Sequence, residues 1–147
     1  MGSFTIAIDV ARDPHTVFAF LADVATMPRW YEAVQHMRPI TPQTTGVGAT
    51  YEMTRDLPGG RFRNEVAVIE YEPDQAFTIE NASEPTPFRY RYTLEPNGGS
   101  TRLRLEGQIT GAGLPGPIAR IDALATQAFK RGMGDNLRQL RRLIEAS

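Results

Sequence analysis

The C-terminal part of the chain reads as one long amphipathic helix, and this feature constrains the fold more than any other. From Pro117 onward, apolar residues recur at steps of three and four, which is the spacing of a helix with one buried face. A helix of about thirty residues is roughly 45 Å long, about the width of a small domain. We therefore expect this helix to lie across another layer of structure and to leave a space between the two.

The preceding part of the chain reads mainly as strands. Residues 4–10 alternate between apolar and polar side chains, the period of a strand with one buried face. Further strand candidates are separated by turns rich in proline and glycine, and they span residues 33–40, 49–56, 61–71, 76–81, 88–94 and 100–109. Because tight turns join antiparallel neighbours, this pattern predicts an antiparallel sheet of about seven strands.

Two short helices are predicted after the first strand. Asp13 followed by Pro14 is an N-cap carboxylate with proline at the first helical position. Pro28 interrupts this segment, and a second helical turn is expected through residues 29–32. Helices segregated from a run of strands predict an α+β fold, with the long C-terminal helix on one face of a curved sheet. Residues 1–147 read as one domain.

The composition argues against several classes of function. With 16 Lys and Arg residues against 17 Asp and Glu residues, the net charge is −1, so nothing points to nucleic acid. The chain has no cysteine, which excludes thiol catalysis and disulfides. Its two histidines fit no zinc-ligand spacing and no nucleotide-binding motif is present, so we expect no metal and no cofactor. No apolar run approaches about 18 residues and no signal-peptide pattern opens the sequence, which predicts a cytoplasmic protein without stable membrane insertion.

Three segments resemble a known family. They are Asp-Pro-His-Thr-Val-Phe-Ala-Phe-Leu-Ala-Asp at residues 13–23, Met-Pro-Arg-Trp at residues 27–30, and Val-Ala-Val-Ile-Glu-Tyr-Glu-Pro at residues 66–73. They are similar to motifs of the polyketide cyclase/dehydrase family, in the START-like, birch-pollen-allergen-like (SRPBCC) superfamily. The resemblance implies a helix-grip fold, in which a curved antiparallel sheet wraps around a long C-terminal helix. That fold carries lipid binders, aromatase/cyclases and hydrolases, so function must be argued from the site.

Parity along the predicted strands separates an inner from an outer face. Phe88, Tyr90 and Tyr92 share one face of their strand, and Arg89 and Arg91 share the other. We expect an aromatic-rich, mainly apolar pocket between the sheet and the terminal helix, suited to a flat hydrophobic ligand. The candidate ligand-binding residues are Trp30, Tyr51, Met53, Phe88, Tyr92, Leu124, Ala125, Ala128, Phe129 and Met133. The alternative is that these side chains pack as core and leave no cavity.

Three further residues are candidates for catalytic work. Arg55 shares the strand face of Tyr51 and Met53, so it either meets a ligand carbonyl or carboxylate or lies at the solvent rim. If Glu65 points inward, it would pair with Arg55, either as a structural ion pair or as a general base with a perturbed pKa. Tyr90 is the third candidate, as a group that moves a proton. The candidate catalytic residues are therefore Arg55, Glu65 and Tyr90.

Two glycines lie inside the predicted terminal helix, where each costs about 1 kcal/mol relative to alanine. Gly132 falls on the apolar face, where it either makes room for a ligand or marks a kink or a close helix–sheet contact. Gly134 lies away from that face and has no such explanation.

Three functions are compatible with this pattern. The first is binding of a hydrophobic small molecule, which could be a lipid, a polyketide-like compound or an aromatic compound. The second takes its reaction from the family resemblance: a cyclase/dehydratase-type enzyme acting on a poly-carbonyl or aromatic substrate. The third is lipid exchange at a membrane surface, through residues 111–116 and the basic end of the terminal helix. The expected partner is a small-molecule ligand rather than nucleic acid, and a homodimer is left open.

Overall fold

A computed structural model of the chain describes residues 2–57, 59–84, 86–110 and 123–147, with only the backbone described at residues 123–125. Strand β1 (Gly2–Val10) is followed by helix α1 (Pro14–Leu21), the 3-10 turn η1 (Val24–Thr26) and helix α2 (Met27–Trp30). The remaining elements are β2 (Val34–Pro39), β3 (Thr50–Leu57), β4 (Gly60–Glu72), β5 (Ala76–Asn81), β6 (Phe88–Asn97), β7 (Ser100–Ile109) and α3 (Ala123–Glu145).

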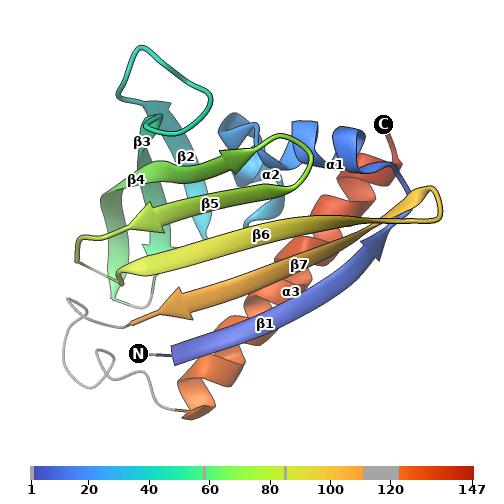
Figure 1. Ribbon diagram of the computed structural model, residues 1–147. Coiled ribbons are helices and arrows are strands. Elements are labelled where there is room, and N and C mark those ends of the chain that lie inside the picture. Colours follow the sequence, from blue (N-terminus) through green and yellow to red (C-terminus); the bar gives the residue numbers. More distant parts are fainter. Residues whose placement is uncertain (1, 58, 85, 111–122) are drawn as a thin grey trace.

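All seven strands belong to one sheet, in the order β1-β7-β6-β5-β4-β3-β2. Every neighbouring pair is antiparallel. Strand β1 forms one edge of the sheet beside β7, and β2 forms the other edge. Figure 1 shows α3 running behind β6, β7 and β1, so the long helix covers one face of the sheet. This arrangement confirms the predicted α+β class, the antiparallel sheet and the helix across it.

Local chemistry explains the two short helices. The Asp13 carboxylate accepts a hydrogen bond from the Thr16 amide at 3.3 Å and caps α1, as predicted from the sequence. The second helix, α2, begins at Met27, two residues earlier than predicted. The first helix, α1, ends at Leu21, before the interruption predicted at Pro28, and Pro28 instead lies in the first turn of α2, where the missing amide hydrogen costs no intrahelical bond.

The core lies between the sheet and α3. Helix α3 buries Met133, Leu137, Leu140 and Ile144 along one face, which confirms the predicted stripe in the described part of the helix. The predicted start at Pro117 lies outside the described residues. The C-terminal end of α3 is tied to the end of β1, because the Ala11 amide donates to the Glu145 carboxylate at 2.8 Å.

One glycine of the sheet makes room for an aromatic ring. A Cβ atom at Gly107 would lie 2.5 Å from the ring of Phe4, so no larger residue fits without moving that ring. The Phe4 ring lies across this position, and its centroid is 6.2 Å from that of Tyr90. Gly107 therefore lets β1 contribute to the same aromatic layer as β6.

Candidate functional site

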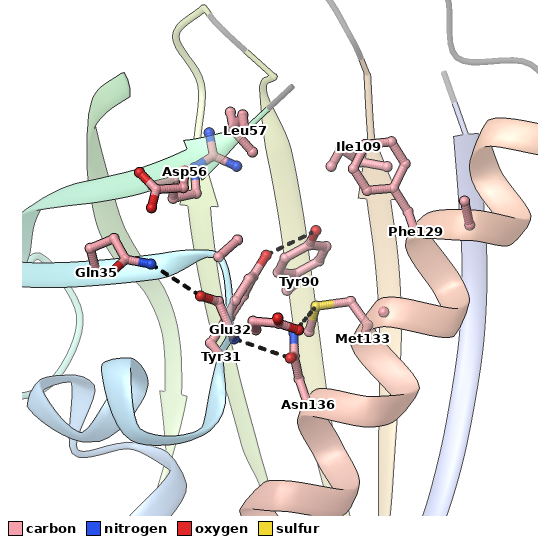
Figure 2. A pocket seen from close by; sticks show the side chains of 14 residues that line it. Tyr31, Glu32, Gln35, Asp56, Leu57, Tyr90, Ile109, Phe129, Met133 and Asn136 are labelled. Atoms are coloured by element: carbon pink, nitrogen blue, oxygen red, sulfur yellow. Dashed lines mark hydrogen bonds between the residues drawn. The ribbon is translucent and has the colours of Figure 1, made fainter. Parts of the chain in front are cut away.

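A pocket of about 420 Å³ lies between α3, the end of β3, β6 and the segment that joins α2 to β2. Its volume falls within the range of small-molecule sites. Figure 2 shows Phe129 and Met133 projecting from α3 toward Tyr90, with Asp56 and Leu57 on the opposite wall. The lining residues are Tyr31, Glu32, Ala33, Gln35, Arg55, Asp56, Leu57, Tyr90, Ile109, Ala128, Phe129, Gly132, Met133 and Asn136.

Arg55 brings a positive charge into the wall of this pocket. The residue is 1% exposed, and its Nη2 donates hydrogen bonds to Asn64 Oδ1 at 2.9 Å and to Thr86 Oγ1 at 2.6 Å. Its guanidinium carbon lies 5.1 Å from the centroid of the Phe88 ring, which is a cation–π contact. Burial lowers the pKa of Arg55, but a guanidinium stays protonated in proteins. The structure therefore places Arg55 inside the pocket wall and not at the solvent rim.

The loop between β5 and β6 holds Arg55 in place. Thr86 is fully buried and has a φ of 50°, a conformation that β-branched residues rarely adopt. Its carbonyl accepts a hydrogen bond from Asn81 Nδ2 at 3.3 Å, and Asn64 Nδ2 donates to the Glu84 carbonyl at 3.2 Å. Backbone strain of this kind persists only when the surrounding contacts hold it. These contacts hold Thr86 in a conformation that turns its hydroxyl toward Arg55.

Two buried tyrosines add hydroxyl groups to the polar lining that includes Arg55. The Tyr31 hydroxyl donates to the Tyr90 hydroxyl at 3.5 Å (Figure 2), and the Tyr90 ring stacks on Phe88 with centroids 4.6 Å apart. Burial raises the pKa of Tyr31 and raises that of Tyr90 well above its ordinary value, while the charge of Arg55 opposes both shifts. Both side chains are therefore neutral phenols at physiological pH. Because Tyr31 donates to Tyr90, the Tyr90 O–H is the donor that can meet a ligand oxygen, and neither neutral phenol is a general base.

The mouth of the pocket is polar. Glu32, Gln35 and Asp56 are exposed there, and Asp56 forms an ion pair with Arg61 at 2.9 Å. Asn136 is buried, and its Oδ1 accepts a hydrogen bond from the Glu32 amide at 3.1 Å. This bond ties α3 to the segment between α2 and β2 and so fixes the two sides of the mouth relative to each other.

The predicted site residues fall into several groups in the structure. Arg55, Tyr90, Ala128, Phe129 and Met133 line the pocket, so it is built by residues from the predicted strands and helix. The other aromatic and methionine candidates are core residues packed around it, except that Tyr51 lines a second hollow described below. These core candidates are Trp30, Met53, Phe88 and Tyr92. The side chains of Leu124 and Ala125 lie outside the described residues.

The inward orientation predicted for Glu65 is wrong. Glu65 is exposed and lies opposite Glu52 of β3 in the strand register. Asn64 lies opposite the buried Met53 and is itself buried. Strict alternation from Tyr71, whose neighbour across the strands is the buried Phe77, would turn Glu65 inward. However, a β-bulge interrupts the register between Val68 and Glu70. A bulge inserts one extra residue and shifts the alternation of faces. Glu65 therefore lies on the outer face and cannot pair with Arg55 in the pocket.

Sequence reasoning missed several lining residues. Tyr31 adjoins Trp30 in the second short helix but was not assigned to a face. Asn136 lies one helical turn after Met133, on the buried side of α3. A polar residue within an apolar stripe is a signal that could have identified it. Glu32 and Asp56 offered no such signal, because exposed acidic residues occur on every protein surface.

Gly132 and Gly134 differ in their surroundings. A Cβ atom at Gly132 would meet nothing within 4 Å, and Gly132 lines the pocket, so it is not a point of close helix–sheet contact. Gly134 is buried under the side chain of Arg138, whose Nη1 would lie 3.6 Å from an added Cβ. Of the two glycines, Gly132 is therefore the one that leaves open space at the pocket wall.

Neither a membrane span nor a metal site is found in the described part of the chain. Among its helices, none is long and apolar enough to cross a bilayer. Its His, Asp and Glu side chains form no group of three or more that could hold a metal ion.

Comparison with protein families identifies a family to which the chain belongs. A family model described as polyketide cyclase/dehydrase and lipid transport matches residues 1–145. The chain belongs to this family. Among curated protein sequences, none is significantly similar to the chain. Family membership confirms the resemblance seen in the sequence motifs, and the family description includes both catalysis and transport.

Solved structures show the same fold over nearly the whole chain. The Zhui aromatase/cyclase from Streptomyces sp. R1128 is similar with a TM-score of 0.77 at 12% identity, covering 97% of this chain and 93% of that one. A START superfamily protein from Mycobacterium smegmatis gives a TM-score of 0.70 at 15% identity, with coverages of 99% and 96%. Ara h 8.0201 gives 0.72 at 13% identity, with coverages of 99% and 98%. At these identities the likeness establishes the helix-grip fold alone.

Proposed function

We propose that this member of the polyketide cyclase/dehydrase and lipid transport family binds a hydrophobic small molecule that carries a carbonyl, carboxylate or phenolic oxygen. The observation that carries the proposal is a pocket of about 420 Å³ whose apolar wall includes Phe129, Met133 and Ile109 and whose polar wall is Arg55 with two phenols. Pockets of this size and lining bury most of a small ligand, and a few polar groups set its orientation.

The polar wall indicates which ligand atom would face it. Arg55 and Tyr90 can donate hydrogen bonds to a ligand, since Tyr31 donates its own proton to the Tyr90 oxygen, and burial raises the pKa of both phenols so that they stay neutral. A ligand oxygen that accepts hydrogen bonds therefore fits this wall better than an ammonium or amide donor. The aromatic rings of Phe129 and Tyr90 would contact a flat apolar body.

Calorimetric titration with a matched pair of ligands tests this function. The probes are 2-acetylnaphthalene, which carries one carbonyl oxygen, and 2-ethylnaphthalene, which has the same shape without it. We expect the wild-type protein to bind the ketone more tightly, and Arg55→Met and Tyr90→Phe to reduce that preference by about tenfold, the effect of one hydrogen bond to a charged or buried group. Arg89→Met removes an exposed arginine of the outer face and should change nothing. Equal affinities for both probes, or a preference that survives Arg55→Met, would refute the proposal.

A second candidate function is catalysis of a cyclase/dehydratase kind. The hydroxyls of Tyr31 and Tyr90 lie 3.5 Å apart, and Arg55 acts electrostatically on both. Such a group of donors can stabilise the negative oxygen of an enolate. A suitable assay follows the closure of 2,6-heptanedione to 3-methylcyclohex-2-enone by the absorbance of the enone. Acceleration by the wild type that is lost in Arg55→Met would support catalysis, and the uncatalysed rate with both proteins would exclude it for this substrate.

Binding is preferred over catalysis because the pocket lacks the base that the sequence predicted. Glu65 lies on the outer face of the sheet, and Tyr90 is neutral at physiological pH. Lipid exchange at a membrane surface, the third function, depends on residues 111–116, which lie outside the described residues. The pocket therefore supports ligand binding first.

A further inference from the structure

A second hollow, of about 340 Å³, lies between the α1–η1 segment and the loop that joins β2 to β3. It shares no lining residue with the pocket described above. Its lining residues are Ala19, Ala22, Asp23, Ala25, Met37, Pro39, Thr44, Thr45, Tyr51 and Tyr71. We call it the loop groove. Nothing in the proposed function uses it.

The floor of the loop groove is apolar and aromatic. Tyr51 and Met37 are 4% and 7% exposed, and Tyr71 is half-buried with its ring edge-on to Phe18 at 5.2 Å. On the helical side the lining side chains are mostly alanines, which extend no further than a methyl group and so leave the hollow open. The Tyr51 hydroxyl donates to the Thr44 carbonyl, which fixes the tyrosine ring against the loop. The groove therefore has a rigid floor that suits an apolar or aromatic body.

The polar groups of the loop groove include a carboxylate and backbone carbonyls that accept hydrogen bonds, beside hydroxyl groups that can donate or accept. Asp23 is its one charged residue, and the lining contains no lysine, arginine or histidine. Asp23 is exposed at the N-cap position of η1, yet its side chain makes no capping hydrogen bond there. The carbonyl of Thr44 accepts the Tyr51 hydroxyl and that of Thr45 accepts Gln43 Nε2, which leaves each oxygen a further lone pair.

The negative charge of Asp23 acts on the Tyr51 hydroxyl at the floor of the groove. Its charge adds to the effect of burial in raising the pKa of the Tyr51 hydroxyl. A carboxylate beside two tyrosine rings presents negative charge together with the negative faces of the aromatic rings. An anionic group would meet repulsion here, whereas a cation would be attracted by both features.

We propose that the loop groove binds a primary ammonium ion carried on an aromatic or short alkyl body. The ammonium has three donors and no acceptor, which matches the Asp23 carboxylate and the carbonyls of the loop. The body would lie on Tyr51 and Met37, with the cation over a tyrosine face. This site is independent of the main pocket, whose polar wall favours a ligand with an oxygen acceptor.

Titration followed by amide chemical shifts tests the proposal, with 2-phenylethylammonium as the probe and neutral 2-phenylethanol as its matched control. We expect shifts concentrated at Asp23, Thr44 and Tyr51, and an affinity for the ammonium at least about fivefold higher than for the alcohol. Asp23→Asn should abolish that difference and leave the fold unchanged, because Asp23 makes no capping bond. Asp9→Asn removes the same charge from β1, at the opposite edge of the sheet from β2, and should preserve the difference.

A second variant tests the shape of the groove rather than its charge. Ala19 is exposed on α1, so Ala19→Leu should fold normally while filling the hollow, and we expect it to weaken both probes. Three outcomes would overturn the proposal: equal affinities of the two probes for the wild type, a preference retained in Asp23→Asn, or shifts confined to Glu32 and Asp56 at the main pocket. The first two outcomes leave the proposed function of the main pocket untouched, whereas the third would also count against its preference for an oxygen acceptor.

Discussion

At the scale of single residues, the polar groups inside the core carry the functional information. Burying a charge is costly unless hydrogen bonds or aromatic faces compensate, and Arg55 has Asn64, Thr86 and the Phe88 ring around it. These three groups are arranged around one charge, and an apolar residue in its place would leave the buried Asn64 Oδ1 and Thr86 Oγ1 without this donor. The arginine is therefore best understood as part of the pocket wall, positioned by a strained loop.

Thr86 is the residue whose role in this positioning is most directly testable. Thr86→Val keeps the shape and the unfavourable φ but removes the hydroxyl that Arg55 contacts at 2.6 Å. We expect a loss of about 1.5–3 kcal/mol in the free energy of unfolding, the range for hydrogen bonds to charged groups. Thr86→Ser retains the hydroxyl and should lose much less. Urea unfolding of both variants measures the difference, and equal stabilities would show that the hydroxyl does not support Arg55.

Tyr92 differs from Thr86 in that its buried hydroxyl makes no hydrogen bond within the described residues. It is fully buried, and burial raises the pKa of the phenol well above the ordinary value and keeps it neutral. Tyr92→Phe removes this polar atom without changing the ring, so we expect the free energy of unfolding to rise by about 1 kcal/mol. Tyr51→Phe, which loses a bond to the Thr44 carbonyl, should instead lower it. A destabilised Tyr92→Phe would indicate an ordered water on the hydroxyl.

At the scale of elements, α3 serves both as the cover of the sheet and as a wall of the pocket. Its buried stripe continues through Leu137, Leu140 and Ile144, while Phe129, Gly132 and Met133 face the cavity. The stripe therefore has a packed part toward the C-terminus and an open part near the pocket. Gly132, in the open part, lowers the stability of the helix but keeps the pocket free of a side chain at this position.

Substitutions of the two helix glycines should separate stability from binding. Gly132→Leu improves helix propensity by up to about 1 kcal/mol, and its side chain would enter open space in the pocket. We expect a higher melting temperature together with a loss of affinity for 2-acetylnaphthalene of at least tenfold. Gly134→Ala gains propensity away from the pocket and should keep full affinity. Calorimetric unfolding and titration of both variants measure this, and unimpaired binding by Gly132→Leu would place the ligand elsewhere.

Element types were predictable from the sequence, whereas the faces of some strands were not. Alternation in residues 88–94 and 100–109 assigned β6 and β7 correctly, because both strands pair without a break in register. On β4 the same rule failed at Glu65, since the bulge at Val68 and Glu70 depends on pairing with β5 and leaves no local signature. The buried partners of Arg55 come from β4 and a loop, so their meeting could not be read from spacing along one element.

At the scale of the whole molecule, the sheet separates two environments. Its inner face carries the aromatic core, the buried arginine and the pocket. Its outer face carries ion pairs between neighbouring or next-neighbouring strands, among them Arg89 with Glu80, Arg91 with Glu70, and Arg102 with Asp9. These ion pairs thus lie on the face of the sheet that does not line the pocket.

The outer face should set part of the acid sensitivity of the fold. Hydrogen bonds from Arg91 at 2.9 Å and Thr78 at 2.7 Å lower the pKa of Glu70 below its ordinary value of 4.5. A carboxyl whose pKa is lowered on folding contributes stability fully above its unfolded value, and this contribution is lost as pH falls through the folded value. We expect Glu70→Gln to cost about 0.5 kcal/mol at pH 7, in the range for partly exposed pairs, and nothing in strong acid.

Glu65→Gln is the matched control for this prediction, because Glu65 is exposed on the same strand and no ion pair joins it to another described residue. Urea unfolding at neutral pH and at stepwise lower pH should show the stability of Glu70→Gln converging on that of the wild type, while Glu65→Gln follows the wild type throughout. A constant difference between Glu70→Gln and the wild type down to low pH would mean that packing of the side chain, and not its charge, stabilises this face. Because the pocket lies on the other side of the sheet, neither variant should alter the affinity for 2-acetylnaphthalene at neutral pH.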